Sequence, residues 1–149
     1  MTLKGLTVRK ILSGDRDLFL AMSREFYRTP GVLHDIPDEF RIRTFEELTR
    51  SDCYLDGRFL LLNGMEAGYA LLAKSFSQEC GGLVVWVDEL YVRPEFQGQG
   101  LASSFFRWLE QNIPAARYRL EIEPDNTRAE ALYHRMGYTH LPYAQMIKE

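Results

Sequence analysis

A short turn with two glycines lies between a predicted strand and a predicted helix, where the backbone can come close to an anion. The turn consists of Gln97, Gly98, Gln99, Gly100, Leu101 and Ala102. Glycine adopts backbone angles that other residues avoid and has no side chain to hold a ligand away. The helix that follows begins with unpaired N–H groups at the positive end of its dipole. The spacing therefore predicts a phosphate-bearing ligand, with a plain strand-to-helix turn as the alternative.

Neither of the two common glycine motifs for phosphate fits this turn. A P-loop needs Lys followed by Ser or Thr directly after its glycines, and that pair is missing here. A dinucleotide-binding turn needs the spacing Gly-x-Gly-x-x-Gly, which Gly98, Gly100 and Ala102 do not match, and this turn lies late in the chain. The predicted anion site is therefore of another kind.

Two acidic residues lie in the predicted strand that leads to this turn, over residues 82–92. The apolar residues of the strand form two pairs that are out of phase by one position: Val85 and Val87, then Leu90 and Val92. A strand that alternates at every second residue cannot bury both pairs, so an extra residue, a β-bulge, is predicted near Asp88 or Glu89. Bulges often lie beside active sites, which makes both carboxylates candidates for acid–base chemistry.

The chain has the size and composition of one domain, so we expect a single unit over residues 1–149. Of its 149 residues, 46% are hydrophobic and 26% are charged, as is typical of a globular protein. No apolar run approaches the ~20 residues that cross a bilayer, and the first residues lack a signal-peptide pattern. A net charge of −3 without a basic stripe argues against nucleic-acid binding. We expect a cytoplasmic protein with neither a membrane nor a nucleic acid as partner.

The cysteines and histidines show no disulfide or metal pattern. Cys53 and Cys80 are too few for a disulfide framework and have no metal-ligand spacing. His34, His134 and His140 are scattered along the chain, and surface or structural roles are expected for them. Neither a bound metal ion nor thiol catalysis is therefore expected.

Hydrophobic periodicity predicts an α/β fold. Alternating residues indicate strands at Leu6–Ile11, Phe59–Leu62, Gly68–Ala73, Gly82–Val92, Tyr118–Ile122 and Tyr138–Lys148. Apolar stripes indicate helices from Asp15, Leu101 and Asn126, and a shorter helix is expected from Pro37 or from a capping box at Thr44. We predict a mixed, mostly antiparallel central sheet of roughly six to seven strands with about four flanking helices.

Two local features indicate how the strands run. Asn63 and Gly64 form a strong hairpin signal, because both central residues of a type I′ turn need a positive φ. In the C-terminal half strands alternate with helices, which implies right-handed crossovers between parallel strands. The sheet is therefore expected to combine antiparallel and parallel pairs.

The glycine turn and its neighbours resemble the acetyl-CoA motif of the GNAT superfamily of N-acetyltransferases. Residues 87–94 and 97–102 match this motif, whose core is Gln/Arg-x-x-Gly-x-Gly/Ala. The family's second motif is matched by Asn126, Ala129, Leu132, Tyr133, Gly137 and Tyr138. Both motifs occur in order and on the expected elements, so the resemblance covers residues 82–138 and implies a GNAT-like fold with a splayed, bulged fourth strand.

The resemblance implies where acetyl-CoA would bind. Its pantetheine arm would pair with the backbone of the bulged strand, its diphosphate would bind N–H groups of the glycine turn, and Asn126 and Tyr133 would contact the arm and the sulfur. The implied cofactor-binding residues are Leu90, Tyr91, Val92, Gln97, Gly98, Gln99, Gly100, Leu101, Ala102, Ser103, Asn126 and Tyr133. The segment Tyr138–Lys148 departs from the family, which commonly ends in two strands, because it is short for both.

Acetyl transfer to an amine needs a base and an acid. An ammonium with a pKa near 10.4 must lose its proton before it attacks the thioester. Glu89 is the preferred base, followed by Asp88, with Glu121 or ordered water as alternatives. Tyr133, placed by the motif, is the expected acid that protonates the departing thiolate, and a backbone N–H freed by the bulge is expected to stabilise the oxyanion.

These features predict direct transfer of acetyl from acetyl-CoA to a primary amine of a small molecule or peptide. The alternatives are a non-catalytic acyl-CoA sensor or docking module, and an enzyme for another acyl donor such as succinyl-CoA. Tyr27 and His34 lie where the family builds its acceptor specificity, and Trp86 is expected either in the acceptor cleft or against the N-terminal helices. The expected partner is the amine acceptor, and a homodimer is an alternative to a monomer.

Overall fold

Five strands form one sheet in the computed structural model, which describes residues 3–149. They are β1 (Leu6–Lys10), β2 (Leu55–Leu62), β3 (Met65–Ser77), β4 (Gly82–Val92) and β5 (Arg117–Leu120). The strands lie side by side in chain order, and every neighbouring pair is antiparallel except β4 and β5, which are parallel. The predicted mixed, mostly antiparallel sheet is confirmed.

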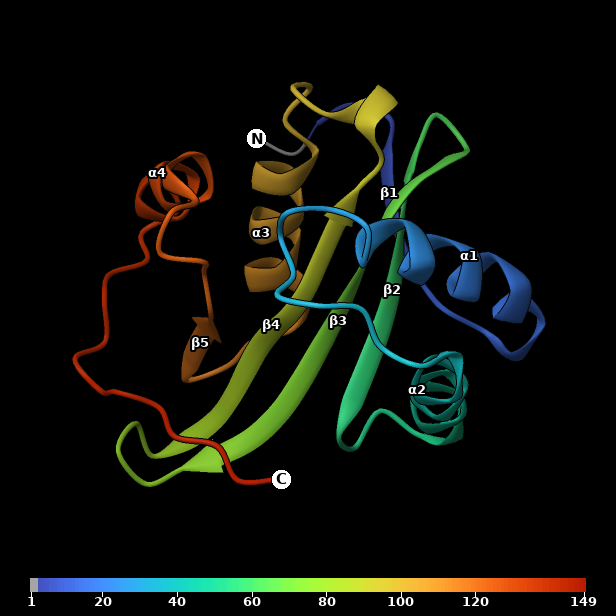
Figure 1. The fold of residues 1–149 in the computed structure, drawn as a ribbon. Helices are drawn as coiled ribbons and strands as arrows, with labels where there is room; N and C mark the ends of the chain where they lie inside the picture. The colour runs from blue at the N-terminus through green and yellow to red at the C-terminus, as the bar shows by residue number, and fades with distance from the viewer. Residues whose placement is uncertain (1–2) are drawn as a thin grey trace.

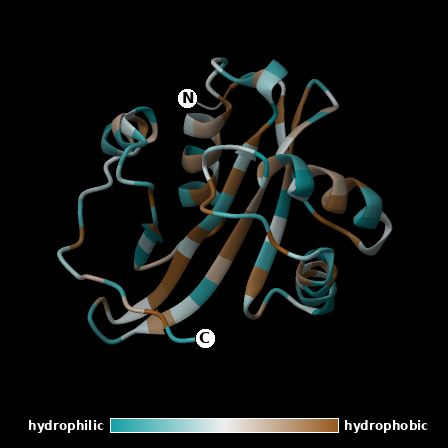
Figure 2. Cartoon of the chain, in the orientation of Figure 1, coloured by the Kyte–Doolittle hydropathy of each residue, from teal (hydrophilic) through white to brown (hydrophobic). Residues whose placement is uncertain are grey.

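Four α-helices cover the two faces of the sheet (Figure 1). Helices α1 (Arg16–Phe26) and α2 (Asp38–Arg50) pack on one face, and α3 (Leu101–Asn112) and α4 (Thr127–Arg135) lie on the other. Hydrophobic residues run along β3 and β4 between these layers (Figure 2). Within residues 3–149, no helix combines the length and apolar character needed to span a membrane.

The β2–β3 hairpin turns at the predicted pair of residues. Asn63 has a φ of 52° and Gly64 a φ of 80°, the signs that a type I′ turn requires. Leu62 pairs with Met65 on either side of the turn. The hairpin prediction is confirmed, although both strands extend further than the apolar runs indicated.

A bulge interrupts β4 where the sequence predicts one. Glu89 pairs with Leu71 of β3 and Val87 pairs with Leu72, so Asp88 is the extra residue without a partner. The insertion brings Val85, Val87 and Leu90 to the same face, against α3. The bulge therefore explains how a single strand can bury two apolar pairs that are offset by one residue in the sequence.

The predicted sixth strand is wrong. Residues 138–149 have no regular secondary structure, so the sheet has five strands and not six or seven. Pro142 lies in this segment and has no N–H to donate to a neighbouring strand. After Tyr138, which packs on the core, its large apolar residues Leu141, Tyr143, Met146 and Ile147 are exposed, so no buried face selects an extended register.

The predicted helix start at Thr44 is also wrong. Helix α2 runs without a break from Asp38, with Pro37 as the residue before its first turn. The hydroxyl of Thr44 donates to the carbonyl oxygen of Phe40, one turn earlier in the same helix. The capping-box pattern therefore lies inside a helix that Pro37 begins.

A substitution at Gly68 of β3 would test how closely strands β3 and β4 pack beside the bulge. A Cβ atom on Gly68 would lie 2.0 Å from the backbone oxygen of Tyr91. We expect Gly68→Ala to lower the free energy of unfolding by about 1–3 kcal/mol, because the backbone must shift. Gly14→Ala is the matched control, since a Cβ there meets no atom within 4 Å. Urea unfolding measures both, and equal losses from the two variants would contradict the close packing.

Candidate functional site

Strands β4 and β5 separate at the bulge. Their pairing ends with Val87 opposite Leu120, while β4 continues to Val92. In residues 3–149, the last part of β4 therefore has a neighbouring strand only on its β3 side. This part contains Leu90, Tyr91 and Val92, whose backbone on the open side can hydrogen-bond an extended ligand as another strand would.

The glycine turn connects this open edge to the start of α3. Gly98 has a φ of 76° and Gly100 a φ of 85°, conformations that favour glycine. Within α3, the first N–H bonded to a carbonyl four residues back is that of Ser104, which binds the oxygen of Gly100. The N–H groups of the preceding residues have no partner in the helix and lie at the positive end of its dipole. The predicted anion site therefore has the required local geometry.

A groove of about 450 Å³ lies between the glycine turn and α4. It is lined by Val92, Phe96, Gln97, Gly98, Gly100, Leu101, Ala102, Ser103, Asn126, Arg128, Ala129, Leu132 and Arg135. The two motifs, separate in the sequence, thus meet across one groove. Of the implied cofactor residues, Leu90, Tyr91, Gln99 and Tyr133 do not line it.

Two arginines of α4 also line this groove, and the sequence analysis missed them. Arg128 and Arg135 lie two helical turns apart, so both side chains project from one face of α4. Neither forms an ion pair with any of residues 3–149. Their charges, together with the start of α3, make the groove positive, as suits a phosphate-bearing ligand. Their seven-residue spacing on a predicted helix could have placed them on one face, but only the fold brings that face to the glycine turn.

Asn126 has a structural role that the sequence did not reveal. Its Oδ1 accepts a hydrogen bond from the N–H of Ala129 at 3.1 Å, so Asn126 caps the start of α4. Its side-chain NH₂ has no partner in residues 3–149 and lies at the groove. A contact with the pantetheine arm stays a prediction.

Glu89 lies on the sheet face that α1 and α2 cover. Its two carboxylate oxygens accept hydrogen bonds from the hydroxyl groups of Tyr27 and Tyr69, each at 2.6 Å. Burial raises the pKa of Glu89 above its usual value, although the two hydrogen bonds oppose this shift. Tyr69, a buried residue of β3, was missed because only the β3–β4 register shows that it faces Glu89. A fixed carboxylate with a raised pKa is suited to act as a base.

Asp88 lies near a different charged group. Although Asp88 reaches the surface, partial loss of water around its carboxylate raises its pKa, and the nearby carboxylate of Glu121, just beyond β5, raises it further. Among the described residues, no hydrogen bond holds the Asp88 side chain. The two bulge carboxylates therefore differ: Glu89 is held by two tyrosines, whereas Asp88 and Glu121 form an acidic pair where β4 and β5 separate.

Trp86 packs against a charge and not against the N-terminal helices. The guanidinium carbon of Arg119 lies 4.1 Å from the centroid of the Trp86 ring, a cation–π contact between paired residues of β4 and β5. Trp86 is absent from the core formed with α1 and α2. His34 is exposed in the loop before α2, and the described residues give it no contact with the site.

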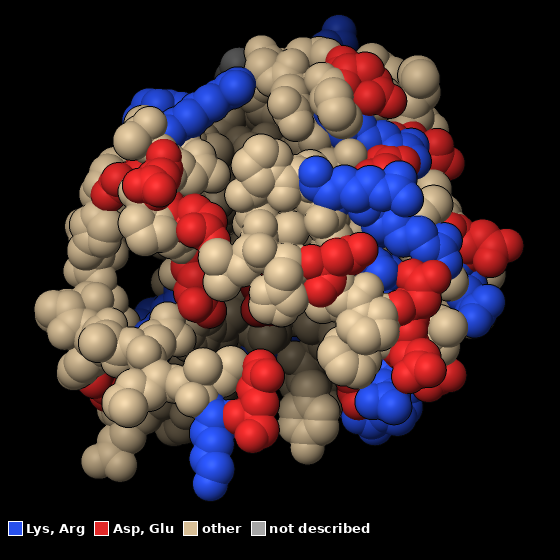
Figure 3. Space-filling view, viewed as in Figure 1, with Lys and Arg blue, Asp and Glu red and all other residues tan. Residues whose placement is uncertain are grey.

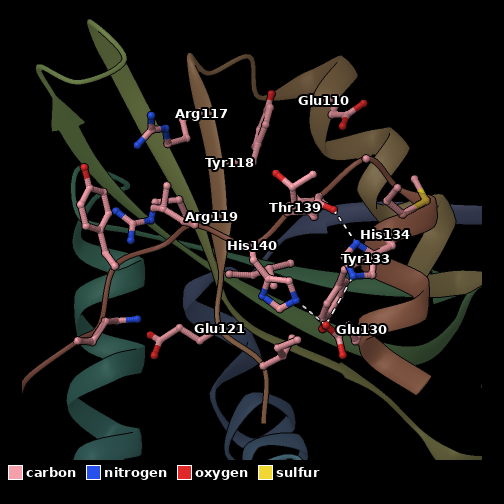
Figure 4. A pocket seen from close by; sticks show the side chains of 18 of the residues that line it. Glu110, Arg117, Tyr118, Arg119, Glu121, Glu130, Tyr133, His134, Thr139 and His140 are labelled. Atoms are coloured by element: carbon pink, nitrogen blue, oxygen red, sulfur yellow. Dashed lines mark hydrogen bonds and ion pairs between the residues drawn. The ribbon is translucent and has the colours of Figure 1, made fainter. Parts of the chain in front are cut away.

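Tyr133 lines a second cavity on the other side of α4. This cavity, of about 710 Å³, lies between β5, α4 and the C-terminal segment (Figure 4). It opens as a hollow beside acidic side chains (Figure 3). The Tyr133 ring packs edge-on against Phe106 at 5.6 Å, and burial raises the pKa of its hydroxyl. Tyr133 therefore lies on the α3–α4 side of the sheet and Glu89 on the α1–α2 side.

Two of the histidines that are apart in the sequence lie close together on the surface, where surface roles were expected for them. His134 and His140 both approach Glu130 at the edge of the second cavity. Cys53 is exposed and Cys80 is half-buried, and neither forms a disulfide.

Comparisons with known proteins agree with this geometry. The family model for the acetyltransferase (GNAT) family matches residues 19–138. A possible acetyltransferase from Clostridium difficile 630 has a TM-score of 0.80 at 16% identity, over 98% of each chain. The aminoglycoside N-acetyltransferase AAC(6')-Iy, solved with the bisubstrate analog CoA-S-monomethyl-acetylneamine, has a TM-score of 0.78 at 15% identity, over 97% of each chain.

A third similar structure is the ribosomal-protein-alanine N-acetyltransferase from Brucella melitensis biovar Abortus 2308. Its TM-score is 0.73 at 15% identity, and the match covers 97% of this chain and 99% of that one. At such identities these structures show a shared fold. The family model spans most of the chain and includes both motifs that meet at the groove. The chain therefore belongs to the acetyltransferase (GNAT) family.

Proposed function

We propose that this acetyltransferase moves acetyl from acetyl-CoA directly to a primary amine of a small molecule or peptide. The observation that carries the proposal is the groove where the glycine turn, the start of α3 and two arginines face one another. The diphosphate binds the N–H groups from Gln97 to Ser103, and Arg128 and Arg135 add positive charge. The pantetheine arm follows the open edge of β4 toward the bulge.

The bulge is where the acceptor and the thioester meet. Glu89 takes the proton of the attacking amine through an ordered water, and Tyr27 and Tyr69 hold its carboxylate in place. Asp88 and Glu121 attract the acceptor, which arrives as an ammonium ion. A cationic amine is therefore the proposed acceptor class.

Acid catalysis comes from the opposite side of the sheet. The N–H freed by the bulge donates to the oxyanion of the tetrahedral intermediate. Tyr133 then gives its proton to the departing thiolate, and its raised pKa keeps the hydroxyl protonated until that step. Both substrates are bound together, and no covalent enzyme intermediate forms.

A non-catalytic acyl-CoA sensor is the alternative, and it would use the same groove. It would have no need for a half-buried carboxylate fixed by two phenol groups. The acyl group is proposed as acetyl, with a larger acyl as the alternative. A cytoplasmic location and a homodimer stay predictions.

The groove arginines should contribute to cofactor affinity. We expect Arg128→Ala and Arg135→Ala each to weaken coenzyme A binding by about 10- to 100-fold, because each removes a charge-assisted contact worth about 1.5–3 kcal/mol. Isothermal titration calorimetry measures the affinity. Arg16→Ala, an exposed change on α1, is the matched control. Unchanged affinity in both groove variants would place the phosphates elsewhere.

The raised pKa of Glu89 should appear in the pH dependence of turnover. A base acts only when it is ionised, so kcat should fall as the pH drops through the pKa of Glu89, above the usual ~4.3 of a glutamate. Glu89→Gln should lower kcat by about 10²-fold or more and remove this acidic limb. Glu46→Gln, an exposed change on α2, should leave the profile as it is. If the limb survives in Glu89→Gln, the base is another group.

Assaying a panel of amines as acetyl acceptors distinguishes an enzyme from a non-catalytic acyl-CoA sensor. We expect at least one cationic amine to release free thiol from acetyl-CoA, and Tyr133→Phe to slow this release without a comparable loss of cofactor affinity. Tyr138→Phe is the control, because the two rings are neighbours at 6.2 Å in the same cluster. No thiol release with any amine, despite tight coenzyme A binding, would favour the sensor.

A further inference from the structure

Three side chains with metal-binding atoms converge at the edge of the second cavity. Glu130 and His134 lie one turn apart on α4, and His140 comes from the segment that follows it. Oε1 of Glu130 is 3.5 Å from Nε2 of His134 and 2.5 Å from Nε2 of His140. The three ligand atoms all lie within 4.8 Å of one another. The side chains turn toward a common point (Figure 4).

The outer contact of His134 fixes how its ring is protonated. Its Nδ1 lies 3.1 Å from the backbone oxygen of Tyr138, which can only accept a hydrogen bond. The proton of the neutral ring is therefore on Nδ1, and Nε2 presents a lone pair toward the Glu130 carboxylate. In the neutral ring this lone pair faces an anionic oxygen, an unfavourable contact that either a second proton on Nε2 or a metal ion between the two atoms would relieve. In metal-bound histidines, the ring nitrogen that does not bind the metal usually donates its N–H to a backbone carbonyl or a carboxylate, as Nδ1 of His134 does here.

We propose that Glu130, His134 and His140 bind a divalent transition metal ion, with zinc as the first choice. Two imidazole nitrogens and one carboxylate suit zinc, whereas magnesium and calcium prefer ligand sets made of oxygen. This proposal does not depend on the proposed acetyl transfer.

Small side-chain rotations give the spacing that zinc needs. Ligand distances of about 2.0–2.1 Å in a tetrahedron place ligand atoms roughly 3.3 Å apart, between the 2.5 Å and 3.5 Å that separate Oε1 of Glu130 from the two histidine nitrogens. His134 and His140 are 51% and 71% exposed, so their rings can rotate without disturbing the core. The three residues supply three ligands, and the open cavity leaves a fourth position for water.

The ion would join two parts of the chain that few other contacts hold together. Residues 138–149 have no regular secondary structure, and they form one wall of the cavity that Tyr133 lines. A metal on Glu130 and His140 would tie this wall to α4. Its role would be to fix the shape of the cavity, which is a structural role distinct from the acetyl-transfer chemistry.

Metal titration of the protein over residues 1–149, without an affinity tag and stripped of metal, tests the site. We expect one Co²⁺ per chain with the visible absorption of a four-coordinate ion, and its displacement by one Zn²⁺. His134→Ala and His140→Ala should each weaken Zn²⁺ binding by more than about 100-fold, since even outer partners of metal ligands cost 10–100-fold. His34→Ala and the double variant Cys53→Ser/Cys80→Ser are controls and should bind as the unaltered protein does.

Two further results separate a metal site from a simple ion pair. Zn²⁺ should raise the midpoint of thermal unfolding of the unaltered protein and leave that of His140→Ala unchanged. Circular dichroism verifies that the variants remain folded. The proposal is overturned if no stoichiometric Co²⁺ spectrum develops, if binding survives both histidine substitutions, or if binding is lost in the cysteine variant. An ion pair between Glu130 and His140 alone would then explain the contact.

Discussion

One extra residue in β4, Asp88, determines which side chains of the strand point toward each face of the sheet. Without Asp88 in the bulge, Leu90 would turn away from α3, and Glu89 would point into the apolar core on that side. An unpaired carboxylate there would be strongly unfavourable, so the bulge is required by burial alone. The same insertion ends the pairing with β5, and this opens the backbone edge. The packing of the core and the open backbone edge thus depend on one irregularity.

The bulge also separates charges of opposite sign. Positive groups lie at the groove between α3 and α4, where a phosphate-bearing ligand is favoured. Acidic groups lie where β4 and β5 part, and Glu89 is held on the far face of the sheet by two tyrosines. An anionic cofactor and a cationic acceptor would therefore approach from different directions and would not compete for one surface.

The parts of this structure that could be predicted from sequence are those with local causes. Asn63 and Gly64 form the hairpin because their own backbone preferences demand it, and the phase change around Asp88 reveals the bulge within one strand. Tyr69 and Glu89, in contrast, are 20 residues apart, and only strand register brings them together. The same holds for His140 and Glu130, whose contact depends on the path of the chain after α4. The hydrophobic pattern within a single strand or helix cannot predict contacts between residues of different elements.

The missing sixth strand has a consequence for the cavity that Tyr133 lines. Strand β5 has four residues, and the segment from 138 to 149 does not extend it with backbone hydrogen bonds. The segment is held by side chains, as where Tyr143 donates to Glu79 and where Tyr138 packs against Phe106. The exposed Tyr143–Glu79 contact contributes little, and a single packed ring such as Tyr138 forms no cooperative ladder of backbone hydrogen bonds. The wall that they hold can therefore change with few substitutions, while the groove and the bulge, which depend on backbone geometry and core packing, cannot.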